Sequence, residues 1–117
     1  MGLYRTSSLT RLRAAGRVLM TLGVVLVHAH SAAADFTINQ KNKVFSVRQI
    51  TIKVGDRITF VNDDSVNHHV FSATQGSEID IVQRPGRSDT VRFSQPGTVD
   101  VECAIHPDMT LEVQVRR

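Results

Sequence analysis

A thiol, an imidazole and a thioether follow one another at equal intervals near the end of the chain. Cys103, His106 and Met109 each lie three residues from the next in the stretch CAIHPDM. Two further imidazoles, His68 and His69, lie upstream in the stretch VNHHVFS. A Cys thiolate, two His nitrogens and a distant Met sulfur together make up a type 1 (blue) copper site. The spacing therefore predicts a metal centre built from the C-terminal triplet and an upstream histidine.

Each of these ligand types suits a copper ion that changes oxidation state. A thiolate stabilises Cu(I) as well as Cu(II), imidazole accepts both, and a long, weak thioether contact keeps the site from the tetragonal geometry that favours Cu(II). Pro107 disfavours helical geometry at His106, so the short loop can curl around one ion. Zinc is disfavoured because a thioether is a poor zinc ligand.

Each candidate ligand also has an interpretation without a metal. Cys103 could be a buried thiol that packs as a small hydrophobic residue. His106 could be a solvated loop residue, and Met109 could fill the core. The metal interpretation is favoured because the three side chains share one short motif. Asp63 and Asp64 lack the spacing of a calcium loop and are interpreted as a solvated turn.

The elements that carry these residues have the pattern of β-strands. Apolar and polar residues alternate over 50–54 and 57–61, and the intervening Gly55-Asp56 predicts a β-hairpin. Five further strand-like runs follow, at residues 66–72, 79–82, 90–93, 99–103 and 111–115. The run at 79–82 could instead be an irregular connection. Because no stretch has a convincing helical period, the pattern predicts an all-β sandwich or barrel.

The first third of the chain has the composition of an export leader. Four arginines and no acid precede the apolar run Val18–Val27, and the small residues Ala32–Ala34 follow it. A membrane-spanning helix needs about 20 apolar residues, and this run has about half that number. We expect a signal peptide over residues 1–34, cleaved after Ala34, and a periplasmic domain over residues 35–117. The alternative is an uncleaved anchor.

Removal of the leader changes the charge of the protein. Ten of the 14 basic residues and all 11 acidic residues lie after Ala34, so the net charge changes from +3 to −1. No basic stripe with interleaved aromatic residues remains, so nucleic-acid binding has no support. The chain has one cysteine. An odd thiol in an oxidising compartment indicates a metal thiolate, a reactive thiol or an intermolecular disulfide.

The combined motifs resemble the cupredoxin family of type 1 blue copper proteins, and within it the amicyanin-like and plastocyanin-like members. The C-x-x-H-x-x-M loop precedes a strand, and NDDSVNHHVFS lies upstream. The resemblance covers essentially all of the chain after the leader. It implies a Greek-key β-sandwich of about seven or eight short strands that binds one type 1 copper ion. The implied ligands are His68, Cys103, His106 and Met109.

Two positions depart from the pattern of that family. Adjacent strand residues point to opposite faces, so His68 and His69 are not both ligands. The resemblance assigns His68 as the ligand and places His69 where the family has an Asn. That Asn helps to tie its strand to the Cys loop, in which a hydroxyl residue often follows the Cys. Ala104 stands at that position here, so both halves of the link differ.

The resemblance implies an exported, non-enzymatic carrier of single electrons between redox proteins. The implied electron port is the exposed edge of His106, with Ile105, Pro107 and Val66 as an apolar docking patch. We expect a monomer that meets its partners transiently, with no nucleic-acid partner and no membrane association after cleavage. The alternative is a periplasmic copper carrier or copper-resistance protein without electron transfer. An enzyme is disfavoured because a Cys–His nucleophile pair lacks a visible orienting residue and oxyanion hole.

Overall fold

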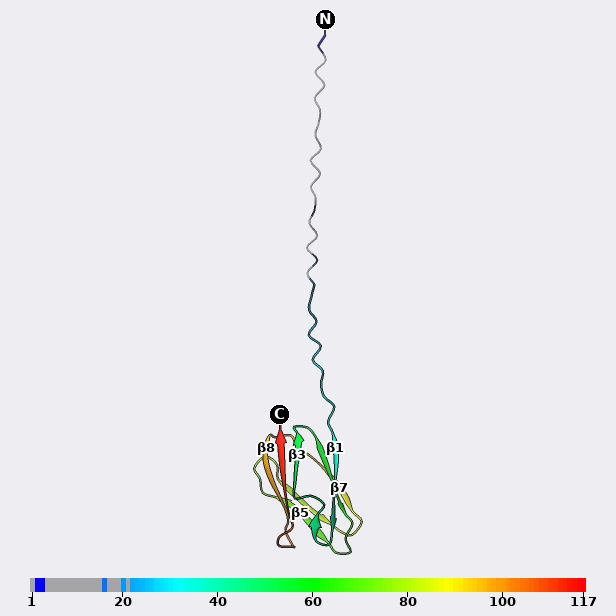
Figure 1. The fold of residues 1–117 in the computed structure, drawn as a ribbon, viewed down its shortest axis with the longest axis vertical. Helices are drawn as coiled ribbons and strands as arrows, with labels where there is room; N and C mark the ends of the chain where they lie inside the picture. Colours follow the sequence, from blue (N-terminus) through cyan, green and yellow to red (C-terminus); the bar gives the residue numbers. More distant parts are fainter. Residues whose placement is uncertain (1, 4–15, 17–19, 21) are drawn as a thin grey trace.

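The computed structural model describes residues 2–3, 16, 20 and 22–117. Half of the predicted leader, residues 1, 4–15, 17–19 and 21, therefore lies outside the described residues. Residues 22–34 form no regular element and run as an extended segment away from the sandwich (Figure 1). Among the described residues, no helix is long and apolar enough to cross a membrane.

Within the described residues the chain forms nine strands in two mixed sheets. The strands are β1 (Asp35–Lys41), β2 (Val44–Phe45), β3 (Gln49–Lys53), β4 (Arg57–Asn62), β5 (His68–Ser72), β6 (Ile79–Gln83), β7 (Ser88–Arg92), β8 (Gly97–Cys103) and β9 (Thr110–Arg116). One sheet has the order β2-β1-β4-β7, and the other has the order β3-β9-β8-β5-β6. The prediction of an all-β sandwich is confirmed. The count is higher than predicted because β1 and the two-residue β2 precede the first predicted strand.

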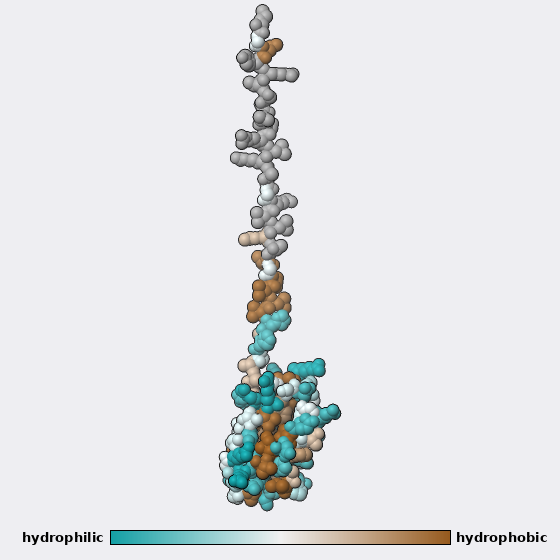
Figure 2. Space-filling model, turned by 180° about the vertical axis from the view of Figure 1, so that it is seen from behind, coloured by the Kyte–Doolittle hydropathy of each residue, from teal (hydrophilic) through white to brown (hydrophobic). Residues whose placement is uncertain are grey.

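The inner faces of the two sheets enclose the core. Burial alternates along the central strands, as it must when one face of each sheet is covered. Phe60 of β4 is fully buried, and its ring meets that of Phe45 edge to face at a centroid distance of 6.2 Å. Seen from one side, apolar surface is surrounded by polar side chains (Figure 2). Because Phe45 and Phe60 are both buried, the ring pair lies in the interior and contributes to the stability of the sandwich.

The predicted hairpin over 50–54 and 57–61 is wrong. β3 pairs in parallel with β9, whereas β4 pairs with β1 and β7 in the other sheet. The Gly55-Asp56 turn therefore carries the chain from one sheet to the other. The Asp56 carboxylate stabilises this crossing by accepting the N–H groups of Lys53 and Ala34, each at 2.8 Å. The turn residues suggested that β3 and β4 pair with each other, but each strand pairs instead with strands elsewhere in the sequence. The run at 79–82 is a strand, β6.

Replacement of Phe60 by alanine tests the position of the core. Because Phe60 is fully buried, we expect Phe60→Ala to lower the unfolding free energy by about 3–5 kcal/mol. Phe71, which is only partly buried on the outer face of β5, provides the matched control, and Phe71→Ala should cost less than half as much. Urea unfolding of both variants measures the difference. Equal losses would contradict this assignment of the core.

Candidate metal centre

Two neighbouring strands bring a thiol and an imidazole to the same end of the sandwich. β5 and β8 pair antiparallel, with Val70 opposite Cys103. His68 lies two residues before Val70 and therefore points to the same inner face. The His68 side chain is fully buried, and Cys103 is 5% exposed. Side chains from two strands thus meet inside the protein, where the sheet limits their movement.

The loop between β8 and β9 returns a second imidazole to this point. The backbone N–H of Cys103 donates to the carbonyl of Met109 at 2.9 Å, which closes the loop at its base. The N–H of His106 donates to the Cys103 carbonyl at 3.3 Å. Asp108 has a positive φ of 67°, a conformation that Asp tolerates better than most residues. The Met109 side chain points inward and is 1% exposed.

Three ligand atoms converge on one point. His68 Nδ1 lies 3.1 Å from His106 Nδ1, and Cys103 Sγ lies 3.8 Å and 3.4 Å from these two atoms. A triangle with these sides has a centre about 2.0 Å from each corner, close to the distances at which His nitrogen and Cys sulfur bind a zinc-sized ion. These residues therefore fit one metal ion without rearrangement of the strands.

A carboxylate fixes the orientation of the buried imidazole. Nε2 of His68 lies 3.1 Å from Asp64 Oδ2, which also accepts the backbone N–H of Lys43 at 2.8 Å. The hydrogen bond from Lys43 and the contact with His68 lower the pKa of Asp64. With its Nε2 proton directed at an ionised carboxylate, His68 keeps the Nδ1 lone pair for a metal.

The sequence did not reveal this role of Asp64. The prediction of a solvated turn holds for Asp63, which is exposed, but is wrong for Asp64, whose side chain is 11% exposed. The one local signal was the spacing of four residues between Asp64 and His68. The contact with Lys43 spans 21 positions and leaves no pattern in the sequence.

Buried amides extend the polar contacts around His68 into the core. The Asn62 side chain accepts the N–H of Asp64 at 2.9 Å and donates to the carbonyls of Val66 and Gln83. Gln83 also accepts the amide of Gln40 at 2.6 Å. All three amide residues are fully buried. Among the described residues, Gln40 Oε1 is the one buried side-chain polar atom without a partner.

The link between β5 and the Cys loop is made by the backbone. The N–H of His69 donates to Cys103 Sγ at 3.4 Å, and the N–H of Ala104 donates to the His69 carbonyl at 3.0 Å. The ring of His69 points away from the thiol and contacts Asp80 Oδ1 of β6 at 2.5 Å. The two adjacent histidines therefore face opposite ways, and His69 contributes its main chain to the surroundings of the sulfur.

The second candidate imidazole, that of His106 in the loop between β8 and β9, lies near the protein surface. His106 is partly buried, while Ile105 is 51% exposed and Pro107 is exposed. Val66, the third residue of the predicted docking patch, is partly buried in the loop before β5. Burial, followed by the nearby charges of His68 and Lys43, lowers the pKa of His106. A lowered pKa favours the neutral imidazole that a metal ion requires.

The fold and this arrangement of ligands define a cupredoxin. The Cupredoxin-like domain family matches residues 15–114, and the chain belongs to this family. Over 75 residues the chain is 33% identical to amicyanin-alpha of Methylorubrum extorquens, an alignment that covers 61% of this chain and 63% of that protein. The chain therefore spans less than two thirds of amicyanin-alpha. Over 87 residues it is 26% identical to the methylamine utilization protein MauL of the same organism, covering 73% and 76% of the two proteins.

Solved structures with the same fold include amicyanins. An amicyanin mutant in its reduced Cu(I) form at pH 4 has a TM-score of 0.64 at 22% identity, covering 74% of this chain and 86% of that chain. A purple cupredoxin from Nitrosopumilus maritimus has a TM-score of 0.58 at 25% identity, covering 70% and 98% of the two chains. The predicted membership of the cupredoxin family is confirmed.

The contact of Asp64 with His68 gives a testable prediction. Asp64→Ala removes the acceptor that orients the imidazole, so the affinity for a bound metal ion should fall about 10- to 100-fold. Asp63→Ala is the matched control, because Asp63 is exposed and its carboxylate contacts the Asn39 amide instead of a histidine. A competition titration against a chelator of known affinity gives both values. Equal affinities in the two variants would show that Asp64 does not orient His68.

Proposed function

We propose that this protein is an exported type 1 copper protein that carries single electrons between redox proteins. The observation that carries the proposal is the triangle of His68 Nδ1, Cys103 Sγ and His106 Nδ1, in which each atom lies within 3.8 Å of the other two. These residues would hold one copper ion, with the buried Met109 as the weak fourth ligand. The copper would supply the Cu(I)/Cu(II) couple that takes up and releases the electron.

The residues around the ligands contribute rigidity and protection from water. His68 and Cys103 are held by paired strands and buried, so these ligands have little freedom to rearrange when the charge of the ion changes. The hydrogen bond from His69 to the Cys103 sulfur would tune the potential, because hydrogen bonds to the thiolate alter the stability of the two copper states. His106 is partly exposed and offers the path for the electron.

We further propose that residues 1–34 are a leader that directs the chain to the periplasm and is then removed. The side chains of 24–27 are 73–84% exposed in the extended segment ahead of the sandwich (Figure 2). Such a run of exposed apolar residues is unfavourable in water. The first strand begins at Asp35, directly after the predicted cleavage site. The released domain would be a monomer that meets its redox partners transiently.

The visible spectrum tests the proposed copper site. Full-length protein is expressed with its leader, purified from the periplasm of a Gram-negative host and loaded with Cu(II). We expect an intense blue band that disappears on addition of ascorbate and is absent from Cys103→Ser, because the band requires the copper–thiolate bond. Met109→Leu should retain the band with a changed reduction potential, since the axial ligand tunes the potential.

The controls separate the electron carrier from the copper carrier. His69→Ala should keep the blue band, because the His69 ring points to Asp80 and only the main chain of His69 contacts the sulfur. Copper binding without the band, or a band without a reversible one-electron wave, would contradict electron transfer. Either result would favour a copper carrier or a resistance protein.

The mass of the exported protein tests the boundary of the leader. We expect a mature chain of residues 35–117, and mutation of the apolar run should leave the full-length chain in the cytoplasm. A product that is heavier by one alanine would place the cut before Ala34. The new α-amino group would then remain at the Asp56 carboxylate, which accepts the Ala34 N–H at 2.8 Å. A full-length chain in the membrane fraction would contradict cleavage and favour an anchor.

A further inference from the structure

We propose that Lys43 makes the face around His106 cationic, and that the redox partner that docks there presents carboxylates. Because it names the chemistry of a partner for the same site, the proposal rests on the function proposed above. Lys43 lies outside the candidate ligand set and far from it in the sequence. Its position beside the electron port follows from the turn between β1 and β2.

The turn holds Lys43 at a defined place. Asn42 and Lys43 form the tip of the β1–β2 hairpin, with φ angles of 53° and 57°. The backbone N–H of Lys43 donates to Asp64 Oδ2, the same oxygen that His68 contacts. Lys41 adds a second attachment, because its Nζ donates to the Asp63 carbonyl at 3.0 Å. The hairpin tip is therefore fixed against the loop that supports His68.

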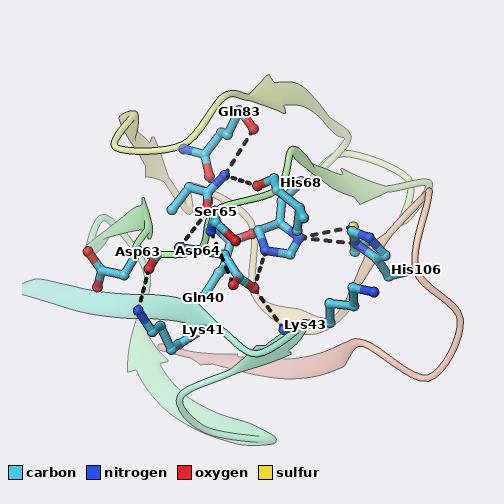
Figure 3. A network of polar contacts seen from close by, with 12 residues as sticks. Gln40, Lys41, Lys43, Asp63, Asp64, Ser65, His68, Gln83 and His106 are labelled. Carbon is cyan, nitrogen blue, oxygen red and sulfur yellow. Dashed lines mark hydrogen bonds and ion pairs between the residues drawn. The ribbon is translucent and has the colours of Figure 1, made fainter.

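From this tip the Lys43 side chain extends toward His106 (Figure 3). The residue is exposed. An anion that approaches the exposed edge of His106 therefore meets the Lys43 ammonium.

Lys43 forms no ion pair with any other described residue. The four ion pairs within the described part of the chain are Arg57–Asp35, His68–Asp64, His69–Asp80 and Arg87–Asp89. None of them includes Lys43. The Asp64 carboxylate accepts the backbone N–H of Lys43 and contacts the ring of His68. Asp108, the acid of the ligand loop, borders a small cavity that is also lined by Arg48.

The turn geometry alone does not account for a lysine at this position. Two consecutive residues with positive φ form the kind of hairpin turn in which Asn-Gly is preferred. A side chain at the second position is strained there, and glycine would avoid the strain. The lysine thus brings a charge to a place where the backbone favours no side chain. Beside Ile105 and Pro107, which are exposed and apolar, it forms a face suited to an apolar contact edged by carboxylates.

Small ions of opposite charge test this face. Cu(I)-loaded protein is oxidised at low ionic strength by ferricyanide or by a cationic cobalt(III) complex. In each reaction one electron leaves Cu(I), which becomes Cu(II), and reduces Fe(III) to Fe(II) or Co(III) to Co(II). Lys43→Gly preserves the turn and removes the charge, so the ratio of the ferricyanide rate to the cobalt rate should fall roughly three- to tenfold. A shift in the reduction potential acts on both rates in the same direction and largely cancels in the ratio.

Two variants control for other effects. Lys43→Arg keeps the charge and should keep the ratio. Lys53→Gln removes a lysine at the opposite end of the sandwich, where β3 ends near the start of β1 and the end of β9, and should leave the ratio unchanged. Added salt should abolish the difference between wild type and Lys43→Gly, because the exposed charge is screened. An equal ratio in Lys43→Gly and wild type would overturn the proposal.

A binding measurement separates failure of this proposal from failure of the proposed function. Hexacyanocobaltate(III), an anion that is redox-inert under these conditions, is titrated into the metal-free and the Cu(I) protein while amide NMR signals are recorded. We expect shifts at 104–106 that are lost in Lys43→Gly. Shifts in the metal-free protein without any blue copper band would support the cationic face and contradict the electron carrier. A blue, reversible site with no anion-induced shifts would support the carrier and overturn the role of Lys43.

Discussion

The pairing of β5 with the end of β8 decides where the ligand atoms lie. Val70 lies opposite Cys103, so His68, two residues earlier, points its ring to the same inner face as the thiol. The N–H of His69 meets the sulfur, and the N–H of Ala104 bonds to the His69 carbonyl. A shift of one residue in this register would turn His68 to the outer face and His69 inward. The candidate metal centre therefore depends on backbone pairing as much as on its side chains.

A fully buried imidazole imposes a second constraint, because a polar group inside a protein must be hydrogen-bonded. The Asp64 carboxylate contacts Nε2 of His68, and the Asn62 side chain accepts the backbone N–H of Asp64. Asn62 also donates to the carbonyl of Gln83 in β6. The Lys43 N–H supplies the remaining contact of the Asp64 carboxylate oxygen. The first hairpin of the domain, though distant in the sequence, is thus part of the environment of the metal site. Burial of one ligand accounts for much of the polar interior at this end of the sandwich.

Local patterns in the sequence predicted the parts of the structure that depend on residues close together in the chain. The spacing of Cys103, His106 and Met109 indicated a loop that folds on itself, and alternation located most strands. The hairpin over 50–61 was wrong because its turn residues fit a crossing between sheets as well as a reversal, and the competing partners β1 and β9 are distant in the sequence. The sequence did not predict the roles of Asp64 and Lys43 for the same reason. Their contacts join β1–β2 to the His68 loop, and no periodicity records them.

The hairpin tip links the candidate metal centre to the exposed face around His106. The main chain of Lys43 supports Asp64 and, through it, the orientation of His68, while its side chain extends toward His106. A partner that binds the ammonium, as proposed above, would therefore contact a residue whose backbone is bonded to Asp64. Two strands and the loop between β8 and β9 already hold the three candidate ligand atoms at distances that suit one ion. The fold thus places the candidate ligands beneath a surface whose charge can be changed at Lys43 without altering any of them.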